Sequence, residues 1–280
     1  MRAIEGQRII DSVREMCIKA NIYLPDDVKK SLEKSLEAED CVGGKDILKM
    51  ICENADLAAK EEVAMCQDTG MAVVFVEMGQ NVWVTGGHIE DLINEGVRQG
   101  YTKGFLRKSV VDDPLKRENT KDNSPAVIHY EIVKGDGLKI TVAPKGFGSE
   151  NMSQLFMLKP SEGVEGVKKV ILQTIKEAGP NPCPPIVVGV GLGGTFEKAA
   201  FLAKKALIRD LGTNNPNKTY ADLEEDLLIR VNDLGIGPQG FGGLTTALGV
   251  HIEAYPTHIA GLPVAINIGC HASRHVTCTL

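Results

Sequence analysis

The sequence has no long apolar run and no excess of basic charge. No stretch approaches the roughly 18 uninterrupted apolar residues that a membrane-spanning helix requires, and the N-terminus, MRAIEGQRII, has no apolar signal core. The chain carries 31 basic and 37 acidic residues, which gives a formal net charge of −6. Nucleic-acid-binding proteins usually carry a basic patch. We therefore expect neither a membrane nor a nucleic acid as partner, and we expect a cytoplasmic protein.

The cysteines lack regular spacing, and the chain lacks repeats. An odd number of scattered cysteines argues against a disulfide framework, and their separations match no zinc or ferredoxin motif. There is no internal repeat, low-complexity tract or long Pro/Ser linker, so one domain spanning residues 1–280 is expected. The seven cysteines are Cys17, Cys41, Cys52, Cys66, Cys183, Cys270 and Cys278.

Hydrophobic periodicity predicts helices over about residues 1–63. Apolar residues recur at helical spacing from Ile9 to Ala20 and again from Ile47 to Ala58. Between these two segments, Pro25 and the two aspartates that follow it are typical of a helix start. The chain therefore begins with a helical N-terminal portion.

After Gly70 the period changes to that of strands. MAVVFVEM (71–78) and NVWV (81–84) predict a strand pair or hairpin, and AVIHYEIV (126–133) and LKITVAP (138–144) predict a hairpin around Gly-Asp-Gly. Helical patterns return over 164–175, 195–209 and 223–231, before the strand-like LGVHIEAY and LPVAINIG. The predicted fold is mixed α/β (α+β), in which helices pack around β-sheet and hairpins.

Three cysteines stand where a regular element is expected to end. Cys66 lies in AMCQDTG, Cys183 in NPCPP and Cys270 in IGCHASRH. Positions among Gly, Pro and polar residues can expose a sulfur to a ligand, whereas Cys17 and Cys52 lie on helical patterns that favour buried thiols. Three thiolates would suit zinc or an iron–sulfur cluster, and a cluster with three protein ligands leaves one iron open to substrate.

Two glycine-rich stretches suggest other roles. Residues 189–194 match G-x-G-x-x-G, but a dinucleotide site also needs a second strand ending in an acid, and DLGTNNPNK follows instead. These glycines could bind an anion at a helix N-terminus or simply allow a tight turn. The second stretch, GIGPQGFGG (235–243), holds five glycines. A structural zinc module built from Cys and His near the C-terminus is a further alternative.

Three segments, taken in this order, resemble those of a known enzyme family: CQDTG, NPCPPIVVGVGLGG and GLPVAINIGCHASRH. Over essentially all its length, the chain resembles the α subunit of class I, iron–sulfur-dependent fumarate hydratases and of the related L(+)-tartrate dehydratases. The resemblance implies a [4Fe–4S] cluster held by Cys66, Cys183 and Cys270. The fourth iron would lack a protein ligand and act as a Lewis acid on the hydroxyl of (S)-malate.

The same resemblance implies roles for five further residues. Gln67 and Asp68 would face the substrate, and Asp68 is a candidate acid/base. Arg107 and the backbone at Gly148 would contact substrate carboxylates, since a guanidinium can bind a carboxylate bidentately. His258, in YPTHIAG, would be an active-site histidine near the leaving group. The residues after Cys270 vary among the resembling enzymes and receive no catalytic role.

The resemblance also implies a partner. In the single-chain enzymes a second region supplies further basic groups and the residue that removes the carbon-bound proton, and this chain stops at Leu280. We therefore expect a separate β subunit, a hetero-oligomer and a small dicarboxylate substrate. The expected reaction is reversible hydration of fumarate to (S)-malate. L(+)-tartrate dehydration is the alternative, and no residue of this chain distinguishes between the two.

Overall fold

The computed structural model describes all 280 residues and divides them between two compact units. The first unit comprises residues 1–24, 55–147 and 274–280, and the second comprises residues 25–54 and 148–273. The sequence predicts one domain over residues 1–280, whereas the structure gathers these residues into two cores that are each built from separate segments. No helix is both long and apolar enough to cross a membrane.

The predicted helical N-terminal portion is confirmed as three helices: α1 (Gly6–Ile22), α2 (Asp26–Ala38) and α3 (Val42–Glu61). α2 follows Pro25 and carries Asp26 and Asp27 in its first turn, as predicted. The sequence pattern missed a short strand that precedes α1, β1 (Arg2–Glu5). Since α1 lies in the first unit, α2 in the second, and the boundary within α3, these helices do not form a layer of their own.

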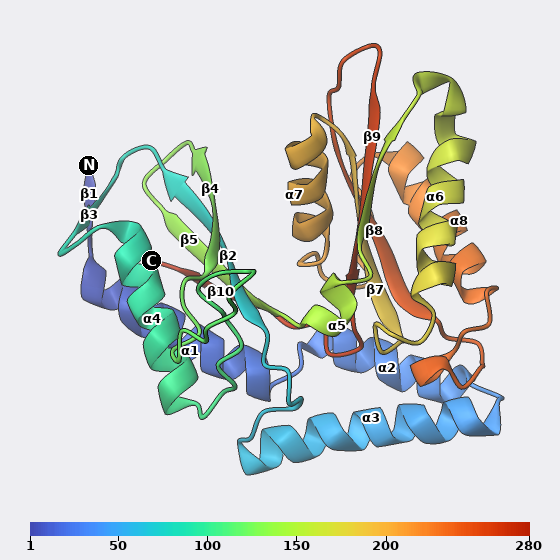
Figure 1. Ribbon diagram of the computed structural model, residues 1–280, viewed down its shortest axis with the longest axis horizontal. Helices are drawn as coiled ribbons and strands as arrows, with labels where there is room; N and C mark the ends of the chain where they lie inside the picture. Colours follow the sequence, from blue (N-terminus) through green and yellow to red (C-terminus); the bar gives the residue numbers. More distant parts are fainter. The chain divides into compact units, whose positions relative to one another are not determined.

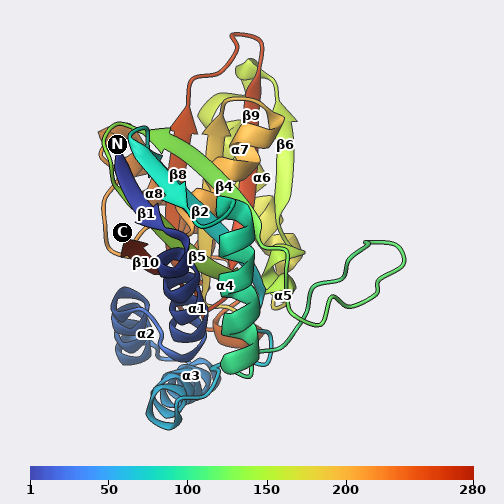
Figure 2. The same ribbon diagram turned by 90° about the vertical axis from the view of Figure 1, so that its left-hand side faces the viewer.

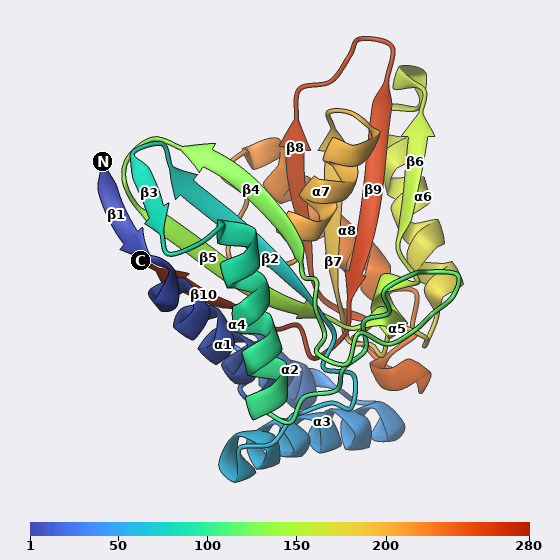
Figure 3. The ribbon, with the colours of Figure 1, turned by 60° about the vertical axis from the view of Figure 1, so that its left-hand side comes forward.

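The first unit is built on a four-stranded sheet with the order β10-β5-β2-β4 (Figure 3). β2 pairs with β4 in parallel and with β5 in antiparallel orientation, and β10 is antiparallel to β5. A separate two-stranded parallel sheet joins β1 to β3. These strands are β2 (Met71–Gly79), β3 (Val82–Thr85), β4 (Val127–Val133), β5 (Leu138–Lys145) and β10 (Val276–Thr279).

Both predicted hairpins are wrong, although their strands exist. β2 lies between β4 and β5, so the segments that flank Gly-Asp-Gly pair with β2 and not with each other. β3 pairs with β1 and not with β2. The physical reason is burial: Ala72 to Val76 are buried on both faces of β2, which places this strand inside the sheet.

One face of this sheet is covered by α1 and by α4 (Ile89–Lys103), which lie side by side (Figure 2). Their core includes Val13 and Val97 packed with Val74 of β2. The helices approach closely because α4 carries glycine at two positions one turn apart. A Cβ at Gly96 or Gly100 would lie 2.7 Å from a side-chain atom of α1.

The second unit contains a four-stranded sheet with the order β6-β9-β7-β8. β7 is parallel to β8 and antiparallel to β9, and β9 is antiparallel to β6. Its strands are β6 (Gln154–Leu158), β7 (Ile186–Gly193), β8 (Ala247–Tyr255) and β9 (Leu262–Gly269). Three short helices complete it: α5 (Phe147–Glu150) and the 3₁₀-helices η1 (Pro160–Glu162) and η2 (Pro238–Gly240).

Helices cover both faces of this second sheet (Figure 1). α6 (Gly163–Ala178) and α8 (Lys218–Asn232) pack on one face, and α7 (Phe196–Ala206) packs on the other. β7 therefore has no exposed residue and reads as a continuous apolar run, as central parallel strands do. The mixed α/β fold class predicted from the sequence is confirmed.

Candidate functional site

In the first unit, the turn after α3 presents Cys66 and is held in place by neighbouring loops. The backbone N–H of Arg107 donates to Thr69 Oγ1 at 2.9 Å, and the Thr69 hydroxyl lies 3.2 Å from the Arg107 carbonyl. The hydroxyl of Tyr101, on α4, lies within 3.0 Å of the carbonyls of Thr69 and Gly70. Burial raises the pKa of Tyr101, so it acts here as a neutral donor. The structure thus brings Arg107 beside the Cys66 turn.

The carboxylate of Asp68 has a fixed orientation. Its Oδ1 accepts the N–H of Gly70 at 3.0 Å, and its Oδ2 accepts the N–H of Phe147 at 2.9 Å. Gly70 adopts φ +76°, and a Cβ there would lie 2.7 Å from the backbone of Lys145, so the turn requires glycine. Because each carboxylate oxygen has two lone pairs, Asp68 keeps the capacity to accept a further proton or hydrogen bond.

The sequence analysis missed Arg274, which reaches this turn. Its Nη2 donates to the carbonyl of Asp68 at 2.6 Å, while Nε and Nη1 are buried without a hydrogen-bond partner. The side chain is only 6% exposed. Buried polar groups are normally hydrogen-bonded, so Nε and Nη1 of Arg274 keep the capacity to donate to a further acceptor. Its only sequence signal is its position four residues after Cys270.

In the second unit, Cys183 and Cys270 emerge at the same end of the sheet. Cys183 precedes β7 and Cys270 follows β9, and these antiparallel neighbours pair Val187 with Gly269. The carbonyl of Cys183 accepts the N–H of His271 at 3.2 Å. Neither cysteine is in a disulfide, and both are partly exposed, as is Cys66. The structure therefore brings two of the three predicted ligands together.

The loop of five glycines also reaches Cys183. The backbone N–H and the side-chain Nε2 of Gln239 both donate to the carbonyl of Pro184, at 2.7 and 2.8 Å. The same Nε2 lies 3.3 Å from Nδ1 of His271. Neither Gln239 nor His271 received a role from the sequence, because contacts of this kind between distant loops leave no periodic pattern.

Gly148, a predicted substrate contact, lies on the approach to Cys183. A Cβ at Gly148 would be 3.7 Å from the carbonyl oxygen of Asn181, so this glycine has room for a ligand beside it. α5 is anchored by an ion pair between Glu150 and Lys204 and by a hydrogen bond from Asn267 to Glu150. Burial lowers the pKa of Lys204, and the Glu150 charge partly offsets that effect.

His258 is not brought to Cys183 or Cys270. It lies in the loop between β8 and β9, and β8 ends where Tyr255 pairs with Gly193 at the far end of β7 (Figure 1). β9 has eight residues and separates this loop from Cys270 by roughly 25 Å at about 3.3 Å per residue. The Nδ1 atom of His258 accepts the N–H of Ala260 at 3.2 Å.

The G-x-G-x-x-G segment has a packing role. A Cβ at Gly189 or Gly191 would lie 2.2 or 2.0 Å from a carbonyl oxygen of α7, so these glycines allow α7 to contact β7 directly. The next strand after α7 begins only at Ala247. The second strand of a dinucleotide-binding unit is thus absent at the required position.

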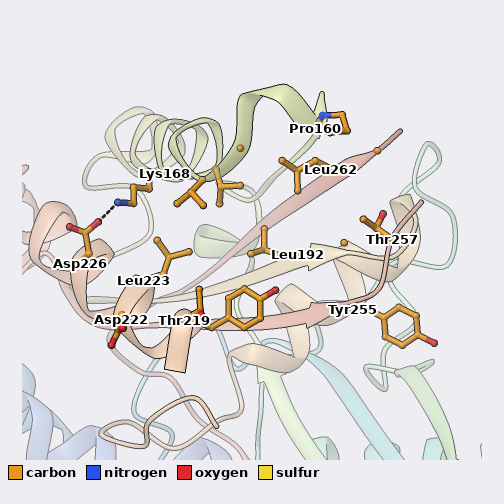
Figure 4. A pocket seen from close by; sticks show the side chains of 16 residues that line it. Pro160, Lys168, Leu192, Thr219, Asp222, Leu223, Asp226, Tyr255, Thr257 and Leu262 are labelled. Carbon is orange, nitrogen blue, oxygen red and sulfur yellow. Dashed lines mark ion pairs between the residues drawn. The ribbon is translucent and has the colours of Figure 1, made fainter. Parts of the chain in front are cut away.

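A mainly apolar pocket of about 540 Å³ lies at the end of the second unit that carries the His258 loop (Figure 4). Leu192, Leu223 and Leu262 line it, and the ion pair of Lys168 with Asp226, at 2.8 Å, lies at its rim. None of the predicted site residues lines this pocket. It is therefore not the site that the sequence indicates.

The predicted ligands are divided between the two units, with Cys66 in the first and Cys183 and Cys270 in the second. Neither unit by itself groups three or more Cys, His, Asp or Glu side chains that could hold a metal ion. None of the seven cysteines forms a disulfide.

Known proteins similar to this chain cover almost all of it. The family model described as Fumarate hydratase (Fumerase) matches residues 10–279. A Methanocaldococcus jannaschii protein provisionally named L(+)-tartrate dehydratase subunit alpha is 46% identical over 273 residues, which are 95% of each chain. The L(+)-tartrate dehydratase subunit alpha of Escherichia coli strain K12 is 35% identical over 273 residues, which are 96% of this chain and 90% of that protein. The chain belongs to the fumarate hydratase family.

Proposed function

We propose that this chain is the α subunit of a two-component hydro-lyase that reversibly hydrates fumarate to (S)-malate. The hydro-lyase class follows from the family. The structural observation that carries the proposal is the pair of partly exposed thiols, Cys183 and Cys270, on loops held together at one end of a sheet. Neither cysteine is disulfide-bonded, so both thiols are available to a metal centre.

The donor set fits an iron–sulfur cluster. We propose Cys66, Cys183 and Cys270 as ligands, because three thiolates prefer a soft metal centre and all three sulfurs lie on accessible loops. When bound, a [4Fe–4S] cluster with one iron free of protein ligands supplies a Lewis acid for the hydroxyl that is added or lost. The assignment of all three cysteines to one cluster comes from the family resemblance.

The residues of the chain would then bind and orient the substrate. Asp68, with both oxygens fixed by backbone N–H groups, is the candidate to hold or deliver the proton of the hydroxyl. Gln67 follows Cys66 directly and would donate to a substrate oxygen. Arg107, anchored through Thr69, would bind one carboxylate, and the open side of Gly148 leaves backbone space for another.

The predicted role of His258 requires a second chain. The length of β9 separates its loop from Cys183 and Cys270 of its own unit. If His258 serves an active site, the Cys183 and Cys270 of that site belong to another copy of this chain. We therefore propose that the enzyme contains at least two α subunits together with its β subunits.

A separate β subunit is proposed on two grounds. The similar proteins from Methanocaldococcus jannaschii and Escherichia coli are both named as alpha subunits. The resemblance also implies that a separate subunit supplies further carboxylate-binding groups and the residue that removes the carbon-bound proton. The cytoplasmic location expected from the sequence stays a prediction.

L(+)-tartrate is the second candidate substrate, and the names of the similar proteins favour it. Tartrate differs from malate by one additional hydroxyl, which needs one additional hydrogen-bond partner in the site. No residue of this chain distinguishes the two substrates, so turnover must decide.

The test uses the α chain purified anaerobically with the subunit that co-purifies with it. We expect hydration of fumarate by the complex at a higher kcat/KM than dehydration of L(+)-tartrate, and no turnover of either substrate by the α chain alone. The reverse preference would assign the tartrate reaction. Full activity of the single chain would contradict the two-component proposal.

A further inference from the structure

The turn that carries Cys183 is held by two residues from two other loops. The carbonyls of Cys183 and Pro184 are its acceptors. Gln239 donates to the Pro184 carbonyl from its backbone N–H and from Nε2, at 2.7 and 2.8 Å. His271 donates its backbone N–H to the Cys183 carbonyl at 3.2 Å, and its Nδ1 lies 3.1 Å from the same oxygen. We call Gln239, His271 and these two carbonyls the carbonyl clamp.

The carbonyl clamp holds Cys183 and Gln239 in a backbone conformation that residues with a side chain rarely adopt. Cys183 has φ +55° and Gln239 has φ +51°, in the left-handed region that residues with a side chain rarely occupy. Such conformations persist only where the surroundings over-determine them, and they concentrate at functional sites. Three donors directed at two consecutive carbonyls provide that determination, and the tautomer of His271 protonated at Nδ1 adds a fourth.

The loop that supplies Gln239 is itself rigid. Glu39 is 2% exposed, and its carboxylate accepts the N–H groups of Leu244 and Cys41 at 2.9 and 3.1 Å. Gly237 adopts φ +69°, and a Cβ there would lie 2.0 Å from the carbonyl of Gly242. Only glycine allows this fold of the loop, which fixes Gln239 relative to β7.

His271 connects the clamp to the other cysteine of this unit, because it directly follows Cys270. A hydrogen bond from His271 to Cys183 therefore also fixes the position of Cys270 relative to Cys183. The tautomer protonated at Nδ1 donates a second bond to the Cys183 carbonyl. The backbones of the two cysteines are then held relative to one another in the metal-free protein.

We propose that Gln239 and His271 are positioning residues that preset Cys183 and Cys270 for cluster binding. This inference rests on the proposed function, since it takes these cysteines as ligands. Neither residue needs to touch a cluster or substrate: each acts through the backbone of Cys183 and Pro184. The glycine-rich loop GIGPQGFGG thereby gains a role as the support of the cluster site.

The experiment compares wild type with Gln239→Ala, His271→Ala and His271→Asn, after anaerobic reconstitution with iron and sulfide. The readouts are iron and sulfide per chain, the rate of iron loss to a chelator, and the melting temperature of the metal-free protein. The outer residues that orient metal ligands typically contribute roughly 10- to 100-fold to metal affinity. We expect the two alanine variants to lose iron faster by about that factor.

Three comparisons separate positioning from general stability. His271→Asn keeps a side-chain N–H near the position of Nδ1 and should recover most of the retention lost in His271→Ala. The melting temperature of the metal-free variants should stay close to that of wild type. Gln7→Ala, at an exposed glutamine of α1 in the other unit, should change neither readout.

The outcomes are distinguishable. Wild-type chelation kinetics in both alanine variants would overturn the clamp while leaving the proposed function intact. A loss of iron matched by an equal fall in the stability of the metal-free protein would also overturn it, in favour of a structural role. A wild-type chain that takes up no iron and sulfide would contradict the proposed function itself.

Discussion

At the scale of single residues, the site depends on groups that the sequence marks weakly. The three loop cysteines could be singled out from short motifs, because functional residues concentrate on loops rich in Gly and polar residues, and the role predicted for Asp68 came from the family resemblance. Arg274 and Gln239 could not, because their functions follow from burial and from carbonyls far away in sequence. An arginine in a polar segment is usually solvated, and nothing in HASRH shows that this one is buried.

Arg274 offers a prediction at this scale. Arg274→Ala removes a charged donor from the Asp68 carbonyl and should lower the free energy of unfolding by roughly 1.5–3 kcal/mol, the usual contribution of a hydrogen bond to a charged group. It should also weaken iron retention, because the turn next to Cys66 loses its anchor. Urea unfolding of the metal-free protein and chelation of the reconstituted protein measure the two effects.

The control for this substitution is Arg8→Ala, at an exposed arginine of α1. It should change unfolding by no more than about 0.5 kcal/mol. Equal stability of Arg274→Ala and Arg8→Ala would show that the buried guanidinium does not hold the turn.

At the scale of elements, periodicity located the strands but not their partners. Helices and strands follow from local spacing, whereas the pairing of β2 with both β4 and β5 depends on segments about 50 to 70 residues apart. The Gly-Asp-Gly turn signal between β4 and β5 was real but did not reveal the strand inserted between them. The same limit applies to the glycines of β7, whose packing against α7 became visible only in three dimensions.

The contact between β7 and α7 can be tested at Gly191. Gly191→Ala would place a Cβ 2.0 Å from the carbonyl of Ala199, so the helix must move away from the sheet. We expect a loss of roughly 1–3 kcal/mol or more in unfolding free energy, as for overpacked cores. Gly43→Ala, in α3 with open space around it, should instead be neutral or stabilising by up to about 1 kcal/mol. A Gly191→Ala variant as stable as wild type would contradict the packing role.

His251 on β8 predicts a pH dependence of stability. Burial, and then the positive charge of Arg209, lower its pKa from 6.5 to about 4. Between these values the unfolded chain binds a proton that the folded chain does not, so acidification favours unfolding. The free energy of unfolding should fall by up to roughly 3 kcal/mol from pH 7 to pH 4 through this group.

The check is denaturation of metal-free wild type and His251→Gln across this pH range. The variant lacks the titrating group, so the difference in unfolding free energy between the two proteins should change with pH below about 6.5. Parallel pH profiles would mean that His251 titrates alike in the folded and unfolded chain.

At the scale of the whole molecule, the chain passes between two units, and the proposed cluster ligands are divided between them: Cys66 belongs to the first, and Cys183 and Cys270 to the second. Sequence analysis could relate Cys66, Cys183 and Cys270 only through the family resemblance, because residues more than 80 positions apart share no local pattern. Family membership over residues 10–279 supports that relation. If His258 serves an active site as proposed, its distance from Cys183 and Cys270 requires a second copy of the chain at that site.

A site shared between two copies of the chain predicts that two inactive variants can complement each other. His258→Ala and Cys183→Ser should each be inactive as the only α chain, since each damages every site. Refolded or co-expressed together with the β subunit, they should recover part of the activity, because a mixed assembly contains one site with intact cysteines and the intact His258 of the other copy. Full activity of His258→Ala alone would remove this histidine from the site. Failure to complement in assemblies shown to be mixed would contradict action between copies.

The central claim is that Cys66, Cys183 and Cys270 hold one cluster. The most direct measurement is iron and acid-labile sulfide per chain after anaerobic reconstitution of wild type, Cys66→Ser, Cys183→Ser and Cys270→Ser. Cys17→Ser is the matched control, because burial raises the pKa of Cys17 to about 12 and keeps its thiol protonated. We predict about four irons and four sulfides in wild type and control, and their loss in all three loop variants. Zinc without sulfide, or a cluster retained in any of the three variants, would contradict the account.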